Sequence, residues 1–347
     1  MTNLSVQPSP ASTPGGDAAH LLEVRDLHVE FHTRDGVAKV INGVSYHLDA
    51  GETLAVLGES GSGKSVTAQA IMGILDMPPA VIPSGEIRYQ GNDLLAMSEE
   101  RRRQVRGKEI AMIFQDALSA LNPVFPVGWQ IGETLRLREK MSRSEARKRA
   151  IELMDLVRIP AAKQRVGDYP HQFSGGMRQR VMIAMALAMN PKVLIADEPT
   201  TALDVTVQAQ IMDLLGDLRR ELNMAMILIT HDLGVVADVA DRIAVMYAGR
   251  IIEHADVHEL YAAPAHPYTK GLLQSIPRLD QRGQDLATIK GLPPNLMRIP
   301  SGCPFHPRCP YAEQVCIDVV PRNLVVGDGR TSACHFAQEV LDGRIDR

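Results

Sequence analysis

The feature that most constrains the fold of this chain is a glycine-rich segment between an apolar run and a helical stretch. Residues 53–57 are typical of a buried strand, and the pattern of residues 66–75 predicts a helix. The residues between them match a phosphate-binding P-loop: Gly58, Glu59, Ser60, Gly61, Ser62, Gly63, Lys64 and Ser65. A plain glycine turn can show the same letters, but the strand–loop–helix context is the one that the motif requires. The sequence therefore predicts an α/β domain that binds phosphate.

The chemistry expected of this loop follows from its residue types. Glycines let successive backbone N–H groups turn inward toward phosphate oxygens, and the following helix adds the positive end of its dipole. Lys64 is expected to reach the β and γ phosphates, and Ser65 to offer its hydroxyl to Mg²⁺.

A second chemical feature is an apolar strand that ends in two carboxylates. Residues 193–196 are apolar, and Asp197 and Glu198 follow them. Asp197 is placed to hold Mg²⁺ through water, whereas Glu198 can orient or deprotonate a water that attacks the γ phosphate. The alternative is that the acidic pair caps a helix.

Composition limits which partners the chain can have and in which cellular compartment we expect it. The formal charge is -4, and this mildly acidic balance argues against nucleic acid as the main partner. No apolar run approaches the roughly 18 to 20 residues that span a bilayer. The first residues lack the basic start and apolar core of a signal peptide, so we expect residues 1–20 to be a disordered leader and the protein to stay in the cytoplasm.

The rest of the chain divides by pattern. Strands are predicted over residues 23–31, 40–48, 193–196, 225–229 and 242–247, and helices over residues 99–106, 143–157, 181–189 and 205–222. Residues 95–175 are more helical and more charged than the segments around them. From residue 266 onward prolines and glycines become dense and periodicity weakens, so we place a boundary near residue 265.

The segment FSGGMRQR, just before the acidic strand, resembles the signature of the ABC (ATP-binding cassette) ATPase family, usually written LSGGQ. Phe173 and Met177 depart from the common form, whereas Ser174, Gly175 and Gly176 match it. In that family the segment opens a helix and caps the γ phosphate of an ATP held by the opposite subunit. The resemblance implies two ATPase subunits that close head to tail.

Further matches to the family occur in the expected chain order. Gln115 resembles the Q-loop residue that touches Mg²⁺ and the transmembrane partner, and Asp204 lies in a segment that resembles the D-loop at the dimer interface. His231 resembles the switch histidine that contacts the γ phosphate; alone it would read as a structural histidine. Phe31 resembles the A-loop aromatic that stacks on adenine, with a plain core residue as the alternative.

The resemblance implies a fold and a domain order. We expect a P-loop NTPase (RecA-like) core of class α/β, with an antiparallel β subdomain and an inserted helical subdomain at about residues 115–178. The nucleotide-binding domain would span residues 21–265. Residues 266–347 would form a small irregular C-terminal module.

That module is similar to the C-terminal extension of the oligopeptide and dipeptide importer subfamily, through the segments AHPYTKGLL and GCPFHPRCP. The implied function is an ATPase that powers peptide import from the cytoplasmic face of the cell membrane. The implied partners are a second, paralogous ATPase, two transmembrane permease subunits and an extracytoplasmic substrate-binding protein, without nucleic acid. Related importers carry nickel, glutathione or another solute, and these stay open.

Two other classes of protein are weighed against this reading. A soluble ABC ATPase of DNA repair or translation usually has two cassettes or a long coiled-coil insertion, which this chain lacks. A non-catalytic regulatory cassette would normally lack Glu198 or His231, and both are present.

The four cysteines of the chain all lie in the C-terminal module: Cys303, Cys309, Cys316 and Cys334. Their spacing is wider than that of a zinc ribbon, and the Cys-Pro steps resemble those around iron–sulfur ligands. The subfamily extension can hold a [4Fe–4S] cluster; zinc, with help from His306 or His335, and four unrelated thiols are the alternatives. No nucleotide motif falls within this module, so we expect it to be structural.

Overall fold

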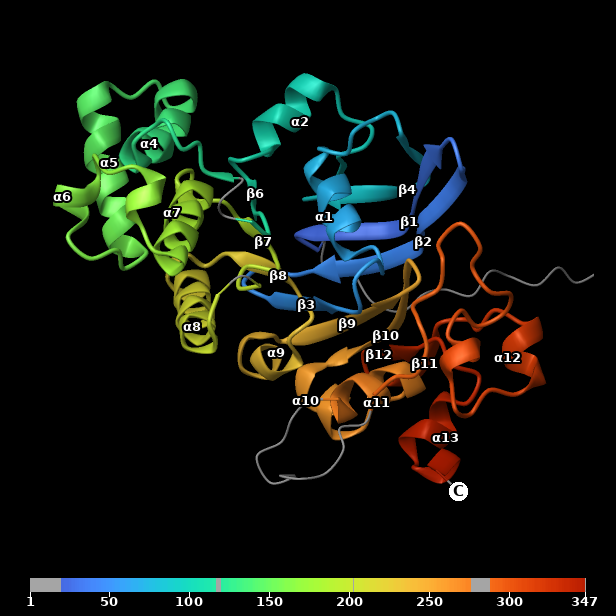
Figure 1. Ribbon diagram of the computed structural model, residues 1–347. Helices are drawn as coiled ribbons and strands as arrows, with labels where there is room; N and C mark the ends of the chain where they lie inside the picture. The colour runs from blue at the N-terminus through green and yellow to red at the C-terminus, as the bar shows by residue number, and fades with distance from the viewer. Residues whose placement is uncertain (1–19, 117–119, 202, 276–287, 347) are drawn as a thin grey trace, which may run out of the picture.

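The computed structural model describes residues 20–116, 120–201, 203–275 and 288–346, and it contains two sheets (Figure 1). Within these ranges the large sheet has eight strands, in the order β11 (Leu324–Gly327), β12 (Arg330–Ser332), β10 (Arg250–Asp256), β9 (Arg242–Tyr247), β3 (Thr53–Leu57), β8 (Ala225–Thr230), β7 (Val193–Asp197) and β6 (Ile110–Ile113). The five strands from β9 to β6 are parallel, and β10, β12 and β11 add antiparallel pairs at one edge.

The central strands are buried on both faces, which explains their unbroken apolar sequence. In β3, Ala55 and Leu57 face one core and Leu54 and Val56 face the other, because successive side chains of a strand alternate. The predicted strands at β3, β7, β8 and β9 are confirmed. β6 lies in the segment read as helical and was not predicted.

The smaller sheet is antiparallel and covers one of these cores. Its order is β2 (Gly36–Leu48), β1 (Leu22–Thr33), β4 (Ala80–Tyr89) and β5 (Asn92–Asp93). The expected antiparallel β subdomain is therefore present. β4 and β5 complete it, although the sequence pattern had indicated only β1 and β2.

The helices cover the faces and one side of the large sheet. They are α1 (Lys64–Met72), α2 (Glu99–Val105), α4 (Val127–Arg138), α5 (Arg143–Leu156), α6 (Ala162–Arg165), α7 (Gly175–Leu187), α8 (Val205–Leu222), α9 (Leu233–Val239), α10 (Val257–Ala262), α11 (Pro267–Gln274), α12 (Gln314–Asp318) and α13 (Ala337–Leu341). Figure 1 shows α4 to α7 gathered at one side of the molecule and the C-terminal elements at the opposite side. β3 and α1, which border the P-loop, lie between these two groups.

The C-terminal part extends the large sheet. Ser332 of β12 pairs with Glu253 of β10, and Arg330 of β12 forms an ion pair with the same Glu253 at 2.9 Å. Both side chains are buried, at 7% and 0% exposure. This strand pairing and the ion pair join the residues beyond the expected boundary near 265 to the sheet of the cassette.

Two further expectations concern the ends of the chain and its relation to a membrane. The expected leader, residues 1–20, falls almost entirely outside the described residues, which begin at His20. In the part of the chain that the structure describes, none of the helices has the length and apolar character to cross a bilayer.

Candidate nucleotide-binding site

The P-loop follows β3 and leads into α1, as predicted. Three of its glycines have positive φ values, of 152° at Gly58, 79° at Gly61 and 106° at Gly63. A Cβ at Gly58 would lie 2.3 Å from the carbonyl oxygen of Met246, so only glycine lets the loop pass this strand. Local geometry therefore demands the glycines that the motif contains.

Lys64 folds back over the loop. Its Nζ donates to the carbonyl oxygens of Gly58 at 2.7 Å and Glu59 at 3.0 Å. Burial lowers the pKa of Lys64, whereas the carboxylates of Glu198, Asp197 and Glu59 oppose that shift. The ammonium is thus held at the mouth of the loop that would receive phosphates.

Ser65 and Asp197 form the pair expected at a magnesium site. The Ser65 hydroxyl donates to Oδ1 of Asp197 at 2.9 Å, across 132 positions of sequence. Burial raises the pKa of Asp197, and the hydrogen bond from Ser65 acts in the opposite direction. A hydroxyl and a carboxylate side by side fit Mg²⁺, which prefers oxygen ligands and keeps several waters.

Glu198 contacts residues of the predicted Q-loop, D-loop segment and switch histidine. Its Oε2 accepts from Nε2 of Gln115 at 2.9 Å and from the Thr201 hydroxyl at 2.8 Å. Its Oε1 lies 3.5 Å from Nδ1 of His231. The alternative of a helix cap is wrong, because the next helix, α8, is capped by Asp204.

These side chains meet because their strands run parallel. β3, β8, β7 and β6 are neighbours, so their carboxyl ends lie at one edge of the sheet. The residues predicted for nucleotide and Mg²⁺ binding end these strands or come after them: Lys64, Ser65, Gln115, Asp197, Glu198 and His231.

The signature segment opens α7. The Ser174 hydroxyl accepts from the N–H of Met177 at 3.4 Å, and a Cβ at Gly176 would lie 2.6 Å from Cγ1 of Val207. α7 packs mainly against β6, α5, α4 and α8. Gly175 lies near Leu203, so the signature and the D-loop segment adjoin within the chain. Their nucleotide role stays a prediction.

Phe31 lies on β1 and is half-buried. It pairs with Ala38 and Ala80 in the antiparallel sheet and packs against the core beneath it. Stacking of its ring on adenine stays a prediction.

Sequence reasoning missed two contacts to the P-loop from the C-terminal module. The guanidinium of Arg308 makes two hydrogen bonds to the carboxylate of Glu59, and the Tyr268 hydroxyl accepts from the N–H of Glu59 at 3.0 Å. Tyr268 stands in the AHPYTKGLL segment, whose resemblance to the importer extension does not indicate a contact with the P-loop. The expectation that the module is structural stays a prediction, and these contacts show that it touches the nucleotide loop.

The four cysteine thiols share one small cavity, which is also lined by His266, Phe305 and His335. Burial raises the pKa of Cys303, that of Cys309 to about 11 and that of Cys334 to about 12, and neighbouring thiols add to each shift. Main-chain N–H groups act in the opposite direction, as where Phe336 N–H donates to Cys334 Sγ at 3.4 Å. These thiols ionise poorly on their own, but the N–H donors favour their thiolate form. A bound group that supplies positive charge would stabilise the thiolates further, so the cavity fits such a group.

The spacing of the thiols also bears on which group would fit. Around one tetrahedral zinc, neighbouring sulfurs would lie about 3.8 Å apart. Among the described residues, no three cysteine or histidine ligand atoms of this cavity lie within 4.8 Å of one another. The thiols as they stand are therefore not arranged as a tetrahedral zinc site.

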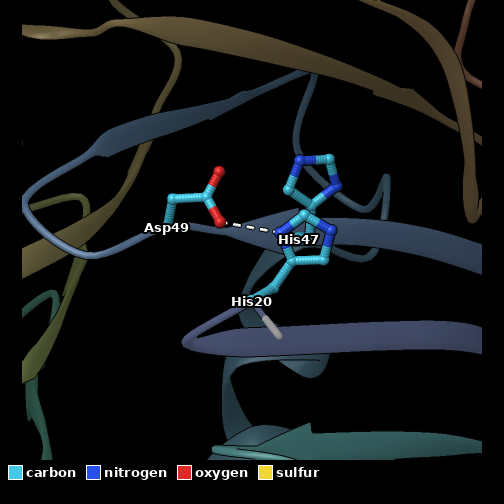
Figure 2. A group of neighbouring side chains, drawn as sticks. All are labelled: His20, His47 and Asp49. Atoms are coloured by element: carbon cyan, nitrogen blue, oxygen red, sulfur yellow. Dashed lines mark hydrogen bonds and ion pairs between the residues drawn. The ribbon is translucent and has the colours of Figure 1, made fainter. Parts of the chain in front are cut away.

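Outside the predicted motifs, nitrogen and oxygen atoms of His20, His47 and Asp49 lie within 4.8 Å of one another, close enough to hold a metal ion (Figure 2). His20 Nδ1 lies 2.7 Å from Asp49, and the His20 and His47 rings stack at 3.8 Å. However, Nη1 of Arg242 lies 2.9 Å from Nε2 of His47. Because arginine can only donate, that nitrogen accepts, and the other nitrogen of a neutral ring then carries the proton. His47 thus has no lone pair to give, and we assign no metal to this group.

Comparison with known proteins gives two family matches. The family described as ABC transporter matches residues 41–201, and the one described as oligopeptide/dipeptide transporter, C-terminal region, matches residues 252–316.

Individual relatives match over most of their length. The oligopeptide transport ATP-binding protein of Bacillus subtilis is 55% identical over 89% of this chain and 86% of its own length. The dipeptide transport ATP-binding protein of the same organism is 51% identical over 90% and 94%. A solved cassette subunit from Clostridium perfringens, described as part of an ABC transporter complex, is 31% identical with a TM-score of 0.60, over 70% of this chain and 91% of that one.

Proposed function

The chain belongs to the ABC transporter family, among its oligopeptide and dipeptide transport ATP-binding proteins, and on that premise we propose that it hydrolyses ATP to power the import of di- or oligopeptides. The ATPase assignment is supported above all by one observation. Ser65 and Asp197 are hydrogen-bonded at 2.9 Å beside Lys64, and Glu198 is held by Gln115 next to them.

ATP binding is assigned to the P-loop. Backbone N–H groups of residues 58–65 would surround the β and γ phosphates at the start of α1. Lys64 would exchange its two carbonyl acceptors for phosphate oxygens. Ser65 and Asp197 would hold Mg²⁺, which supplies charge neutralisation for the phosphates when bound.

Hydrolysis is assigned to Glu198. Its carboxylate would orient the attacking water and take its proton as the water oxygen bonds to the γ phosphorus, while the bond from that phosphorus to the β–γ bridging oxygen breaks and ADP leaves. Gln115 and Thr201 fix that carboxylate, and His231, 3.5 Å away, is placed to contact the γ phosphate.

A complete ATP site needs a second subunit in this proposal. Ser174, Gly175 and Gly176 would cap the γ phosphate of an ATP on the opposite P-loop, and Asp204 would lie at the interface. A paralogous ATPase is the proposed second subunit. One related cassette has been solved as a dimer with ADP and phosphate, at 27% identity and a TM-score of 0.61 over 68% of this chain and 98% of that one.

The remaining partners are proposed from the transporter class of the relatives, which are named as transport ATP-binding proteins. We place the chain peripherally at the cytoplasmic face of the membrane, with two permease subunits and an extracytoplasmic binding protein. Residues 21–265 would form the nucleotide-binding domain and residues 266–347 the extension.

A [4Fe–4S] cluster is proposed for the thiol cavity, held by Cys303, Cys309, Cys316 and Cys334. The one cavity that all four thiols line and the N–H donors at the sulfurs support this assignment. Protein prepared without oxygen should absorb at about 400 nm and contain about four irons per chain. One zinc per chain, or neither metal, would refute the cluster.

The function is tested in the assembled transporter. Membranes solubilised in mild detergent should yield this chain together with permease subunits, identified by mass spectrometry. In proteoliposomes, peptide with its binding protein should stimulate phosphate release, and Lys64→Ala should abolish both release and uptake. Stimulation by nickel or glutathione but not by peptides would overturn the substrate class.

A further inference from the structure

Glu59 places a negative side chain in the loop that must receive a triphosphate. Arg308 pairs with it through two bonds, from Nη1 to Oε2 at 2.7 Å and from Nη2 to Oε1 at 2.9 Å. The side chain of Glu59 is 24% exposed and that of Arg308 is 6% exposed, so water screens the ion pair only in part. The two charges offset each other, and the fork of two parallel bonds fixes the orientation of Glu59.

Arg308 is itself held from several sides. Its Nε donates to the carbonyl oxygen of Lys290 at 3.1 Å, and its Nη1 donates to the Tyr247 hydroxyl at 3.3 Å. The guanidinium carbon lies 5.8 Å from the ring centre of Tyr247 and 6.0 Å from that of Phe305. The guanidinium is therefore a fixed point against which Glu59 is placed.

The main chain of Glu59 is held as well. Its N–H donates to the Tyr268 hydroxyl at 3.0 Å. Its carbonyl accepts from the N–H of Ser62 at 3.2 Å and from Nζ of Lys64 at 3.0 Å. A shift of Glu59 would thus move the carbonyl that Lys64 contacts and the turn that leads to it.

The fixed point belongs to the cysteine-bearing turn. Arg308 ends the short 3-10 helix His306–Arg308, between Cys303 and Cys309. The carbonyl of Cys303 accepts from the N–H of His306 at 3.0 Å, and the N–H of Cys309 donates to the carbonyl of His306 at 3.3 Å. The turn that places two thiols in their cavity also places the guanidinium on the P-loop.

We propose that Arg308 is a positioning residue for the nucleotide site. By holding Glu59 it keeps the P-loop in its phosphate-binding conformation, so ATP affinity depends on the fold of the cysteine-bearing turn. This inference rests on the proposed function, because it requires the P-loop to bind ATP.

Two simpler accounts give different results in mutants. If the pair only fastened the module to the cassette, its loss would lower stability and leave ATP affinity unchanged. If Arg308 only neutralised Glu59, then Glu59→Gln would strengthen ATP binding. The pair Arg330–Glu253 is a matched control, since it is buried and joins the C-terminal part to β10 without touching the P-loop.

The test is an equilibrium titration of the full-length chain with a fluorescent ATP analogue and Mg²⁺. Arg308→Gln and Glu59→Gln should each raise the Kd about tenfold, as when the binding-competent loop falls to about a tenth of the molecules. The double variant should resemble either single variant, because the two side chains act as one unit. Arg308→Lys keeps the charge but loses the fork, and should raise the Kd about threefold.

The controls separate the outcomes. Arg330→Gln should lower the unfolding temperature and leave the Kd within about twofold of the wild type. Cys309→Ser should raise the Kd together with its loss of iron. A wild-type Kd in Arg308→Gln, tighter binding in Glu59→Gln, or an equal rise in Arg330→Gln would each overturn the proposal. Failure of Lys64→Ala to weaken binding would instead refute the nucleotide site itself.

Discussion

Replacement of Glu198 by Gln isolates the charge of the carboxylate from its shape. The two hydrogen bonds that Glu198 receives, from Gln115 and Thr201, both go to Oε2. An amide oxygen can accept both, and the amide nitrogen would then take the place of Oε1 beside His231. We therefore expect the free energy of unfolding to change by no more than about 0.5 kcal/mol.

The effect on hydrolysis should be large by comparison. An amide cannot accept the proton of the attacking water, and a positioned general base contributes about 10² to 10⁴ in rate. That range corresponds to about 3 to 5 kcal/mol in the activation barrier. ATP binding should survive, because Lys64, Ser65 and Asp197 keep their contacts.

Three measurements on one preparation decide the matter. They are phosphate release by the assembled transporter at saturating ATP, nucleotide affinity by titration, and thermal unfolding. Thr201→Val is the matched control, since it removes one contact to the carboxylate but leaves the base, and should slow release less than tenfold, or by about 1 kcal/mol. Near wild-type release by Glu198→Gln would refute the assignment of the base.

Four further outcomes are expected. Lys64→Ala should weaken nucleotide binding by at least about tenfold, measured by titration, because a charged donor to the phosphates is lost. In a mixture with wild-type partner, Ser174→Ala should reduce photolabelling at the partner's P-loop; reduction only at its own Lys64 site would contradict the head-to-tail arrangement. Cys316→Ser should lose iron and loosen residues after about 300 in hydrogen exchange, if metal binding and folding of the module are coupled. Burial lowers the pKa of His266 to about 3, below the unfolded value near 6.5. The contribution of His266 to stability is therefore present above pH 6.5 and is lost as the pH falls toward 3. His266→Asn should reduce this decrease in the free energy of unfolding, measured by urea unfolding across that pH range.

Much of the fold could be predicted because its pattern is local. β3, β7 and β8 are apolar runs with both faces buried, and α8 has the predicted range 205–222. β6 could not be predicted, because an apolar run of only four buried residues within a charged, helical stretch cannot be distinguished from part of a helix by its periodicity. β12 is three residues long and is held by its pairing with β10 and β11, which no local pattern reveals.

The candidate site divides in the same way. Asp197 and Glu198 stand at the end of β7, and Lys64 and Ser65 open α1 after the loop that follows β3, so the parallel order of the strands brings them together. The contact of Arg308 with Glu59 spans 249 positions, and neither residue type is demanded by a motif there. Such a contact depends on how the C-terminal part packs against the cassette, and local sequence patterns do not indicate that packing.

That docking bears on what the C-terminal part is. The match to the peptide-transporter C-terminal region begins at residue 252, which lies inside β10 and not after the cassette. β12 extends the sheet from β10, and Arg330 supplies the cation for a carboxylate, Glu253, that would be costly to bury unpaired. Tyr268 and Arg308 both contact Glu59 of the P-loop. Because sheet, ion pair and P-loop contacts all cross the expected boundary, a change in the thiol cavity has a direct structural route to the residues that contact Lys64.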